Sequence, residues 1–383
     1  MGRFRLRVAA ATSLIALLLA GCASVDPDAA STEPESREST ETLAADLEAA
    51  VGGLLGESGI PGAVFLATKD GKPQWSYVYN NEERQADPVE FDQVFAYRSI
   101  TKSFVVTALL TLVDEGQVSL DDPIGDYVEG VPNGDRVTLR HLATMRSGLA
   151  NYSAMPELGE LLMDDPTVSV TDTELIAAAL TAPFEFEPDA QYMYSNTNAV
   201  LLGMVIKEVT GEDWGDAVRS RILEPLGLDS VTYPADPASV PQVATPYQWL
   251  DDELEVLPAF SPTLFGAAGG LFGTVTDLAT WADELGQGTL LDPATQKERL
   301  DSFGPTADDP LSPEYDEYGI GIGKIGDYVG HTGNGLGYQA LAMHNIETEV
   351  SVAILINATT EDGDLPAHLF ELLVPVLELT REL

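Results

Sequence analysis

The sequence contains a single cysteine, Cys22, in 383 residues. One cysteine cannot form an internal disulfide bond, and its position near the N-terminus removes it as a catalytic thiol of a folded domain. Histidine is almost as scarce, with four in the chain, and no two of them have the spacing typical of metal ligands. The sequence therefore predicts neither a disulfide-stabilised fold nor a zinc centre.

Positive charge is also scarce, because 19 lysines and arginines stand against 62 aspartates and glutamates. The formal net charge of −43 would repel nucleic acid, so no nucleic-acid partner is expected. The acidic residues are spread along the chain rather than gathered in one tail. This pattern indicates a solvated acidic surface, of a kind suited to salty surroundings.

The N-terminal apolar run, 8–20, is shorter than the roughly 20 residues that a membrane-spanning helix needs. Arginines precede it, so 1–21 is predicted to be a signal peptide. It ends in Leu-Ala-Gly-Cys at 19–22, which resembles the bacterial lipobox, where the cysteine becomes the lipidated first residue of the mature protein. We expect an exported lipoprotein, held on the outer face of the bacterial cell membrane through Cys22. The alternative is a chance cysteine after an ordinary signal peptide.

Residues 22–42 are rich in Ser, Thr, Glu, Asp and Pro and poor in large apolar side chains. Such a segment buries too little surface to offset its ordering entropy, so it is predicted to be a flexible acidic tether. The rest, 43–383, is long enough for a large core. We expect an α/β lobe, formed by about 43–110 and 260–383, and a helical lobe over about 111–259.

Apolar periodicity predicts the elements of this domain. Helices are expected over 43–55, 139–144, 172–180, 197–209, 214–222 and 365–379. Strands are expected over 62–68 and 74–79, joined by a turn at 69–72, and later over 319–324, 337–345 and 350–357. Strands near both ends with helices between them indicate one sheet built from both parts of the chain.

A serine and a lysine, Ser99 and Lys102, stand three residues apart where a continuous apolar run begins. The run predicts a buried helix that ends near Gly116. Positions i and i+3 share a helix face, so the hydroxyl and the amine can form a hydrogen bond. Burial and the positive end of the helix dipole would lower the pKa of the lysine and make it a proton acceptor. The alternative is that Ser99 is a helix N-cap and Lys102 a surface lysine.

Two further stretches could complete a site around this pair. Tyr194 and Asn196 precede a predicted helix, where a phenol can share a proton with a lysine and an amide can both donate and accept. Later, His331 and Thr332 stand in a glycine-rich turn and are expected to point into a cleft. Tyr-x-Asn alone is a weak signal, and a histidine in a glycine turn can be purely structural.

In this order, Ser99-x-x-Lys102, Tyr194-x-Asn196 and His331-Thr332-Gly333 resemble the serine β-lactamase and penicillin-binding-protein family. The resemblance is greatest to its D-alanyl-D-alanine carboxypeptidase, class C β-lactamase and esterase branch. It implies an α+β fold, with a five-stranded antiparallel sheet flanked by helices and an inserted all-helical lobe. It implies no metal or organic cofactor, and we expect a monomer.

The resemblance also implies roles. Ser99 would be the acylated nucleophile, Lys102 its proton acceptor and Tyr194 the group that passes the proton to the leaving group. Asn196 would orient the substrate, while His331, Thr332 and Gly333 would form the opposite wall. The backbone N–H groups of Ser99 and Asn334 would form the oxyanion hole. There is no Gly-x-Ser-x-Gly, which argues against an α/β-hydrolase.

These roles predict a serine hydrolase, most simply a D-alanyl-D-alanine carboxypeptidase-like penicillin-binding protein. Its substrate would be a small molecule or a peptidoglycan stem peptide, and β-lactams would be covalent ligands. A carboxypeptidase must bind a carboxylate, and Lys324 is the only lysine or arginine between Ser302 and Leu379. His331 would be mostly neutral at pH 7. A small-ester esterase, a β-lactamase and a catalytically silent binding or sensor protein are the alternatives.

Overall fold

The computed structural model describes residues 33–234, 236, 239–250, 253–306, 312–360 and 362–379. One compact unit is Ile60–Ala367, and the other combines the described parts of Met1–Gly59 and His368–Leu383. The predicted signal peptide and Cys22 lie outside the described residues. None of the helices in these described ranges combines the length and the apolar character that crossing a membrane requires.

The first helix, α2, confirms the helix predicted over 43–55 but starts earlier, because it spans Glu33–Ser58. Residues 33–42, which we predicted to be part of a flexible tether, are therefore helical, whereas 22–32 lie outside the described residues. Extending a formed helix by one residue costs far less than nucleating it.

The Ile60–Ala367 unit contains one antiparallel sheet of eight strands, in the order β2-β1-β12-β11-β10-β9-β8-β7. The sheet has three strands more than the five-stranded sheet that the resemblance implies. Its five long strands are β1 (Gly62–Lys69), β2 (Lys72–Asn80), β10 (Tyr328–Gly335), β11 (Tyr338–Asn345) and β12 (Val350–Ile356). Three short strands extend the sheet beyond β10: β7 (Gly304–Pro305), β8 (Glu317–Tyr318) and β9 (Gly323–Ile325). Because β1 pairs with β12, residues near both ends of the sequence meet inside the sheet.

Helices are the main regular elements between β2 and β10, as predicted. Its helices are α3 (Thr101–Asp114), α4 (Leu139–Ala143), α5 (Pro156–Asp164), α6 (Asp172–Thr181), α7 (Asn196–Thr210), α8 (Trp214–Val218), α9 (Glu224–Leu226), α10 (Val275–Gln287) and α11 (Pro293–Asp301). The helices α5, α9 and α11 and the small strands β3 (Phe95–Ala96), β4 (Tyr247–Leu250), β5 (Glu253–Val256), β6 (Phe272–Gly273) and β13 (Ala358–Thr359) were not predicted. The closing helix α12 spans Leu365–Leu379, as expected.

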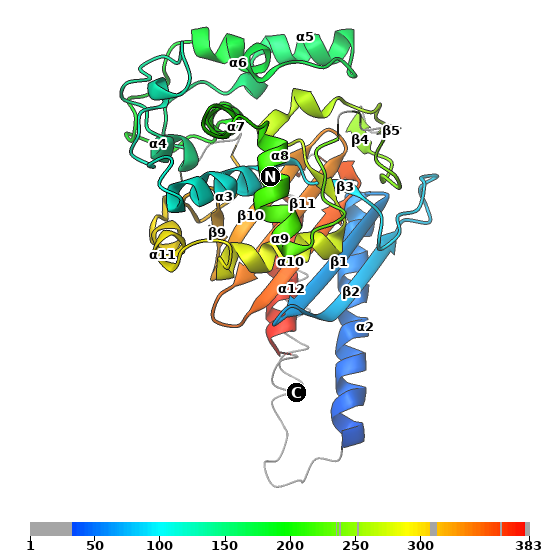
Figure 1. Cartoon of the computed structure of the whole chain (residues 1–383). Coiled ribbons are helices and arrows are strands. Elements are labelled where there is room, and N and C mark those ends of the chain that lie inside the picture. The colour runs from blue at the N-terminus through cyan, green and yellow to red at the C-terminus, as the bar shows by residue number, and fades with distance from the viewer. Residues whose placement is uncertain are drawn as a thin grey trace. The chain divides into compact units, whose positions relative to one another are not determined.

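The central helix α3 connects the sheet side of this unit with the helical side. It packs against α7 and α8, while α10 lies along β1, β11 and β12 (Figure 1). The rings of Phe104 on α3 and Trp281 on α10 stack with 3.8 Å between their centres. The Trp281 indole N–H also donates to the Ser103 hydroxyl at 2.8 Å. These contacts fix the start of α3 relative to the sheet, and this is where Ser99 lies.

Two expectations about the C-terminal strands were wrong. The glycine-rich stretch 330–335 is not a turn, because it forms most of β10, paired with β11 over its full length. Gly330 is needed in that strand, since a Cβ there would lie 1.9 Å from the Ala342 carbonyl oxygen. The strand expected over 319–324 is interrupted before β9, because Gly321 adopts a φ of 70°.

Candidate active site

Ser99 and Lys102 form the predicted pair. Ser99 lies in a short 3₁₀ turn, Arg98–Ile100, directly before α3, and its hydroxyl is 2.9 Å from Lys102 Nζ. Lys102 Nζ also donates to the Ala268 carbonyl oxygen at 2.7 Å. Lys102 is fully buried, so it is not a surface lysine, and Ser99 does not cap the helix. Burial holds the pKa of Lys102 well below its ordinary value of 10.5, which favours the neutral amine that can accept a proton.

Tyr194 comes from the loop that precedes α7 and reaches the same place. Its side chain is buried, and Lys102 Nζ lies 5.0 Å from the centre of its ring. Burial holds the pKa of Tyr194 well above its ordinary value, Tyr315 raises it further, and the adjacent Ser99 side chain opposes the shift. The buried phenol therefore stays protonated, and apart from the adjacent Ser99 side chain its oxygen has no hydrogen-bond partner among the described residues. A buried hydroxyl without a partner is costly, and beside a nucleophile it is available to a reacting group.

The cavity beside Ser99 has a volume of about 290 Å³ and is mainly apolar. Its polar lining includes Ser99, Ser153, Asn196 and Asn334, and its apolar lining includes Tyr152, Leu158, Leu162, Leu264, Phe265, Ala268 and Leu336. Asn196 Nδ2 donates to the Ser153 hydroxyl at 2.7 Å, so the amide is held at the rim. The arrangement can hold an apolar group next to the serine and orient a polar one through Asn196.

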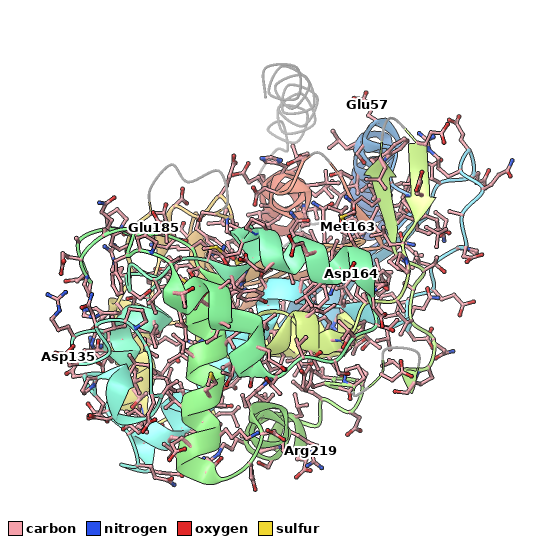
Figure 2. All side chains as sticks on the ribbon, turned by 90° about the horizontal axis from the view of Figure 1, so that it is seen from above. Glu57, Asp135, Met163, Asp164, Glu185 and Arg219 are labelled. Carbon is pink, nitrogen blue, oxygen red and sulfur yellow. The ribbon has the colours of Figure 1, made fainter. Side chains whose placement is uncertain are left out.

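The helix α5 covers one side of this cavity without becoming part of the core. None of its residues is buried, although Leu158 and Leu162 line the cavity. Met163 is 88% exposed, and Figure 2 shows Met163 and Asp164 at the end of this helix on the face seen from above. This wall of the cavity therefore packs less tightly than the wall that contains Ser99, which adjoins the buried helix α3.

Strand β10 approaches the Ser99 turn at Gly333. A Cβ at this position would lie 2.3 Å from the Tyr97 carbonyl oxygen and 3.2 Å from the Ser99 nitrogen, so only glycine permits the contact. The next residue, Asn334, lines the cavity. The predicted oxyanion hole, formed by the N–H groups of Ser99 and Asn334, stays a prediction that this proximity supports.

His331 and Thr332 do not point into the cleft as expected, and neither lines the cavity. His331 is fully buried, with Nδ1 3.1 Å from the Tyr315 hydroxyl and Nε2 3.2 Å from the Tyr318 hydroxyl. The Tyr315 hydroxyl also lies 2.9 Å from Thr332 Oγ1. The two tyrosines come from the segment beside β9, and no local pattern in the sequence indicates that they cover β10. Burial, and then the charge of Lys102, lower the pKa of His331 to about 3, so the ring is neutral.

Lys324 is not brought to the cavity. It lies on β9 opposite Val329 of β10, and its Nζ is 3.7 Å from a Glu317 carboxylate oxygen. It does not contribute to the cavity lining. Lys324, which was expected to bind the substrate carboxylate, therefore lies beside the carboxylate of Glu317 instead.

Arg98, which immediately precedes Ser99, was not predicted to be part of the site. Of the described residues that line the cavity, Arg98 alone is cationic. It is buried, and its Nε and Nη2 donate to the carbonyl oxygens of Gly335 at 2.9 Å and Leu336 at 2.8 Å. Burial lowers its pKa to about 10, which keeps the charge at neutral pH. Only its position next to Ser99 could have drawn attention to it.

Comparison with known proteins agrees with this geometry. A D-aminopeptidase from Gluconobacter oxydans is 25% identical over 326 residues, which cover 83% of this chain and 60% of that protein. A D-stereospecific amidohydrolase from Streptomyces shares 30% identity, with a TM-score of 0.74 over 85% of this chain and 97% of the other. A D-amino acid amidase from Ochrobactrum anthropi, solved with D-phenylalanine, shares 26% identity, with a TM-score of 0.72 over 88% of this chain and 99% of the other. The chain thus spans less than two thirds of the D-aminopeptidase but nearly all of the two solved structures.

The family resemblance inferred from the three motifs is confirmed over most of the chain. The family model described as Beta-lactamase matches residues 47–373, which include Ser99, Tyr194 and His331. The α+β fold agrees with that of the amidohydrolase and amidase structures. The chain is a serine hydrolase and belongs to the Beta-lactamase family.

Proposed function

We propose that Ser99 is the nucleophile that becomes acylated. Its hydroxyl oxygen attacks the substrate carbonyl carbon while neutral Lys102 takes the hydroxyl proton. The phenol of Tyr194 donates a proton to the leaving group as the scissile bond breaks and is reprotonated from Lys102. Water then hydrolyses the acyl ester and releases the acid. The 2.9 Å contact between Lys102 and Ser99 carries this assignment, and the opposite pKa shifts of Lys102 and Tyr194 support it.

We infer that the substrate is a small amide or ester with an apolar acyl part and no carboxylate in the cleft. The single observation that carries this inference is the composition of the cavity, which is mostly apolar and whose only cation among the described lining residues already binds two backbone carbonyls. A net charge of −43 also attracts an amine and repels a carboxylate. The relatives described as D-stereospecific amidohydrolase and D-amino acid amidase favour an amide of a D-amino acid.

A comparison of two amides tests this inference. We expect kcat/KM for D-phenylalanine amide to exceed that for N-acetyl-D-alanyl-D-alanine by at least about tenfold, and the L-amide to react more slowly than the D-amide. The Ser99→Ala protein, prepared identically, is the control for contaminating hydrolases. Faster cleavage of the dipeptide than of the amide would overturn the inference.

A D-alanyl-D-alanine carboxypeptidase-like penicillin-binding protein is the second candidate. The observation that favours it is the charge of Arg98 at the cavity wall, since a cation there could attract a terminal carboxylate. This candidate requires cleavage of the dipeptide and covalent labelling of Ser99 by a fluorescent penicillin. The rate at which the label is released then separates a penicillin-binding protein from a β-lactamase.

We also propose that the mature protein begins at a lipidated Cys22 and is attached to the outer face of the bacterial cell membrane. The proposal rests on the sequence Leu-Ala-Gly-Cys at 19–22 after a short apolar run. Mass spectrometry of the native N-terminus should find a diacylglycerol-modified Cys22. An unmodified N-terminus at another residue would contradict it.

A further inference from the structure

A second cavity lies beside the one that contains Ser99. It also measures about 290 Å³, and most of its lining is apolar, with Val240, Val243, Ala244, Pro246, Pro258, Ala259, Phe260, Phe272 and Tyr338 among the lining residues. Arg98 and Leu336 line both cavities. The two cavities are therefore neighbours, separated at the residue that precedes the nucleophile.

The guanidinium of Arg98 lies between two aromatic rings, one from the lining of each cavity. Its central carbon is 4.1 Å from the ring centre of Phe265, which lines the Ser99 cavity. The same carbon is 5.2 Å from the ring centre of Tyr338, which lines the second cavity. Hydrogen bonds to the carbonyl oxygens of Gly335 and Leu336 hold the group in this place. Five N–H donors in a planar group suit such a double attachment, which a lysine could not reproduce.

The backbone at Arg98 adds a second observation. Its φ is 51°, in the left-handed region that favours glycine and is uncommon for a long side chain. Glycine would adopt this backbone with less strain and would leave the space between Phe265 and Tyr338 empty. The long Arg98 side chain thus occupies a position whose backbone geometry favours glycine.

We propose that Arg98 is a specificity-determining residue that separates the Ser99 cavity from the second apolar cavity and so limits the length of the acyl group. This proposal rests on the acyl-Ser99 function proposed above. With Arg98 in place, a short acyl group fits beside Ser99, and the second cavity is closed to its end. Without the guanidinium, a straight apolar chain can continue past Leu336 into the second cavity. Burial of each further methylene favours binding by roughly fourfold, so the preference for long acyl chains should rise when the second cavity becomes accessible.

The test measures hydrolysis of p-nitrophenyl butyrate and p-nitrophenyl octanoate by the full chain. Arg98→Gly should raise the octanoate to butyrate ratio of kcat/KM at least tenfold, even if both rates fall. Arg98→Lys, which keeps a long cationic side chain but not the double attachment, should raise the ratio by less than Arg98→Gly does. Adding Ala259→Trp to Arg98→Gly should refill the second cavity and reverse the gain, because Ala259 is exposed and lines only that cavity. A purely structural role for Arg98 would lower both rates and leave the ratio unchanged, and that result would overturn the proposal.

A binding measurement separates this proposal from the proposed function. Ser99→Ala and Ser99→Ala/Arg98→Gly are titrated with butyramide and octanamide by calorimetry, which needs no turnover. The preference for octanamide should rise at least tenfold in the double variant. An unchanged preference overturns the partition, whereas absence of hydrolysis by the unmodified protein overturns only the acyl-Ser99 mechanism. If Arg98→Gly does not fold, Leu336→Ala, which widens the same boundary, should shift both preferences in the same direction, and no shift would count against the proposal.

Discussion

Two regions meet at Ser99, the start of α3 and the strand β10, and they differ in whether their buried polar side chains have partners. On the α3 side, Lys102 is buried without a carboxylate partner, and apart from Ser99 the neighbouring Tyr194 hydroxyl has no hydrogen-bond partner among the described residues. On the β10 side, both nitrogens of His331 lie within hydrogen-bond distance of tyrosine hydroxyls. One side leaves the proposed proton-transfer groups available to a substrate, while the polar groups of His331 on the other side are bonded within the protein.

This difference distinguishes side chains suited to proton transfer from side chains that only stabilise the fold. Burial without a charged partner lowers the pKa of Lys102, which suits a proton acceptor, and raises that of Tyr194, which keeps the phenol protonated as a donor. His331 is equally buried, but its lowered pKa of about 3 keeps it neutral throughout the working range. A perturbed pKa therefore marks a reactive group here only where the group is also next to the nucleophile.

The largest expected effect is that of Ser99→Ala, which removes the proposed nucleophile from the cavity lining. We expect amide and ester hydrolysis to fall by at least about 10⁴-fold and covalent labelling by an alkyl fluorophosphonate to disappear. Ser103→Ala, on the adjoining helix α3, is the matched control for labelling, because the Ser103 hydroxyl is buried and accepts a hydrogen bond from Trp281. Intact labelling of the Ser99→Ala protein would show that another residue is the nucleophile.

The next largest effect should come from the two proton-transfer groups. Lys102→Met and Tyr194→Phe should each lower the acylation rate by about 10²–10⁴-fold, since each removes one site for the same proton. The double variant should lose much less than the product of the two, because the residues act as a unit. Pre-steady-state labelling of Ser99 measures all four proteins. Fully multiplicative losses would mean that Lys102 and Tyr194 act independently.

A substitution of His331 on β10 should change the free energy of unfolding rather than the rate of hydrolysis. The pKa of His331 is about 3 in the folded protein, against about 6.5 in an unfolded chain, so the unfolded state takes up the proton first. Its contribution to the free energy of unfolding should therefore be fully present above pH 6.5 and lost as the pH falls towards 3. Between pH 6.5 and 5 this loss amounts to about 2 kcal/mol.

Urea unfolding of His331→Gln at both pH values tests this expectation. The variant should lack that part of the pH dependence, whatever its stability at pH 7. His344, whose pKa burial lowers to about 4, contributes in both proteins and cancels in the difference. Parallel stability curves for the variant and the unmodified protein would show that His331 does not stay neutral.

The smallest effect should be that of Lys324→Ala. Lys324 lies beside Glu317 and outside the cavity, so kcat/KM should change by less than about twofold for a neutral amide and for a D-Ala-D-Ala peptide alike. Glu317→Ala is the matched variant at the other end of the pair. A selective loss of at least tenfold on the peptide would instead make Lys324 a carboxylate partner.

Much of the fold could be predicted because its elements are strongly periodic. The hairpin β1–β2, the helix α7 and the closing helix α12 lie within one or two residues of their predicted positions. The helix α5 and the short strands β7 and β8 were missed, since α5 buries no residue and the two strands are too short for an alternating pattern. Glycines at 330, 333 and 335 concealed β10, because glycine usually weakens a strand.

The sequence by itself determined the Ser99–Lys102 contact, because three residues of helical backbone place both side chains on one face regardless of the rest of the molecule. It also determined the family, through three motifs in their order. Only the tertiary structure decided that Tyr315 and Tyr318 enclose His331. The same holds for the contact between Lys324 and Glu317, and for the hydrogen bond from Arg98 to Gly335, which is distant in the sequence. Local backbone geometry fixes distances within a turn or two, whereas contacts between distant segments depend on how the whole chain packs.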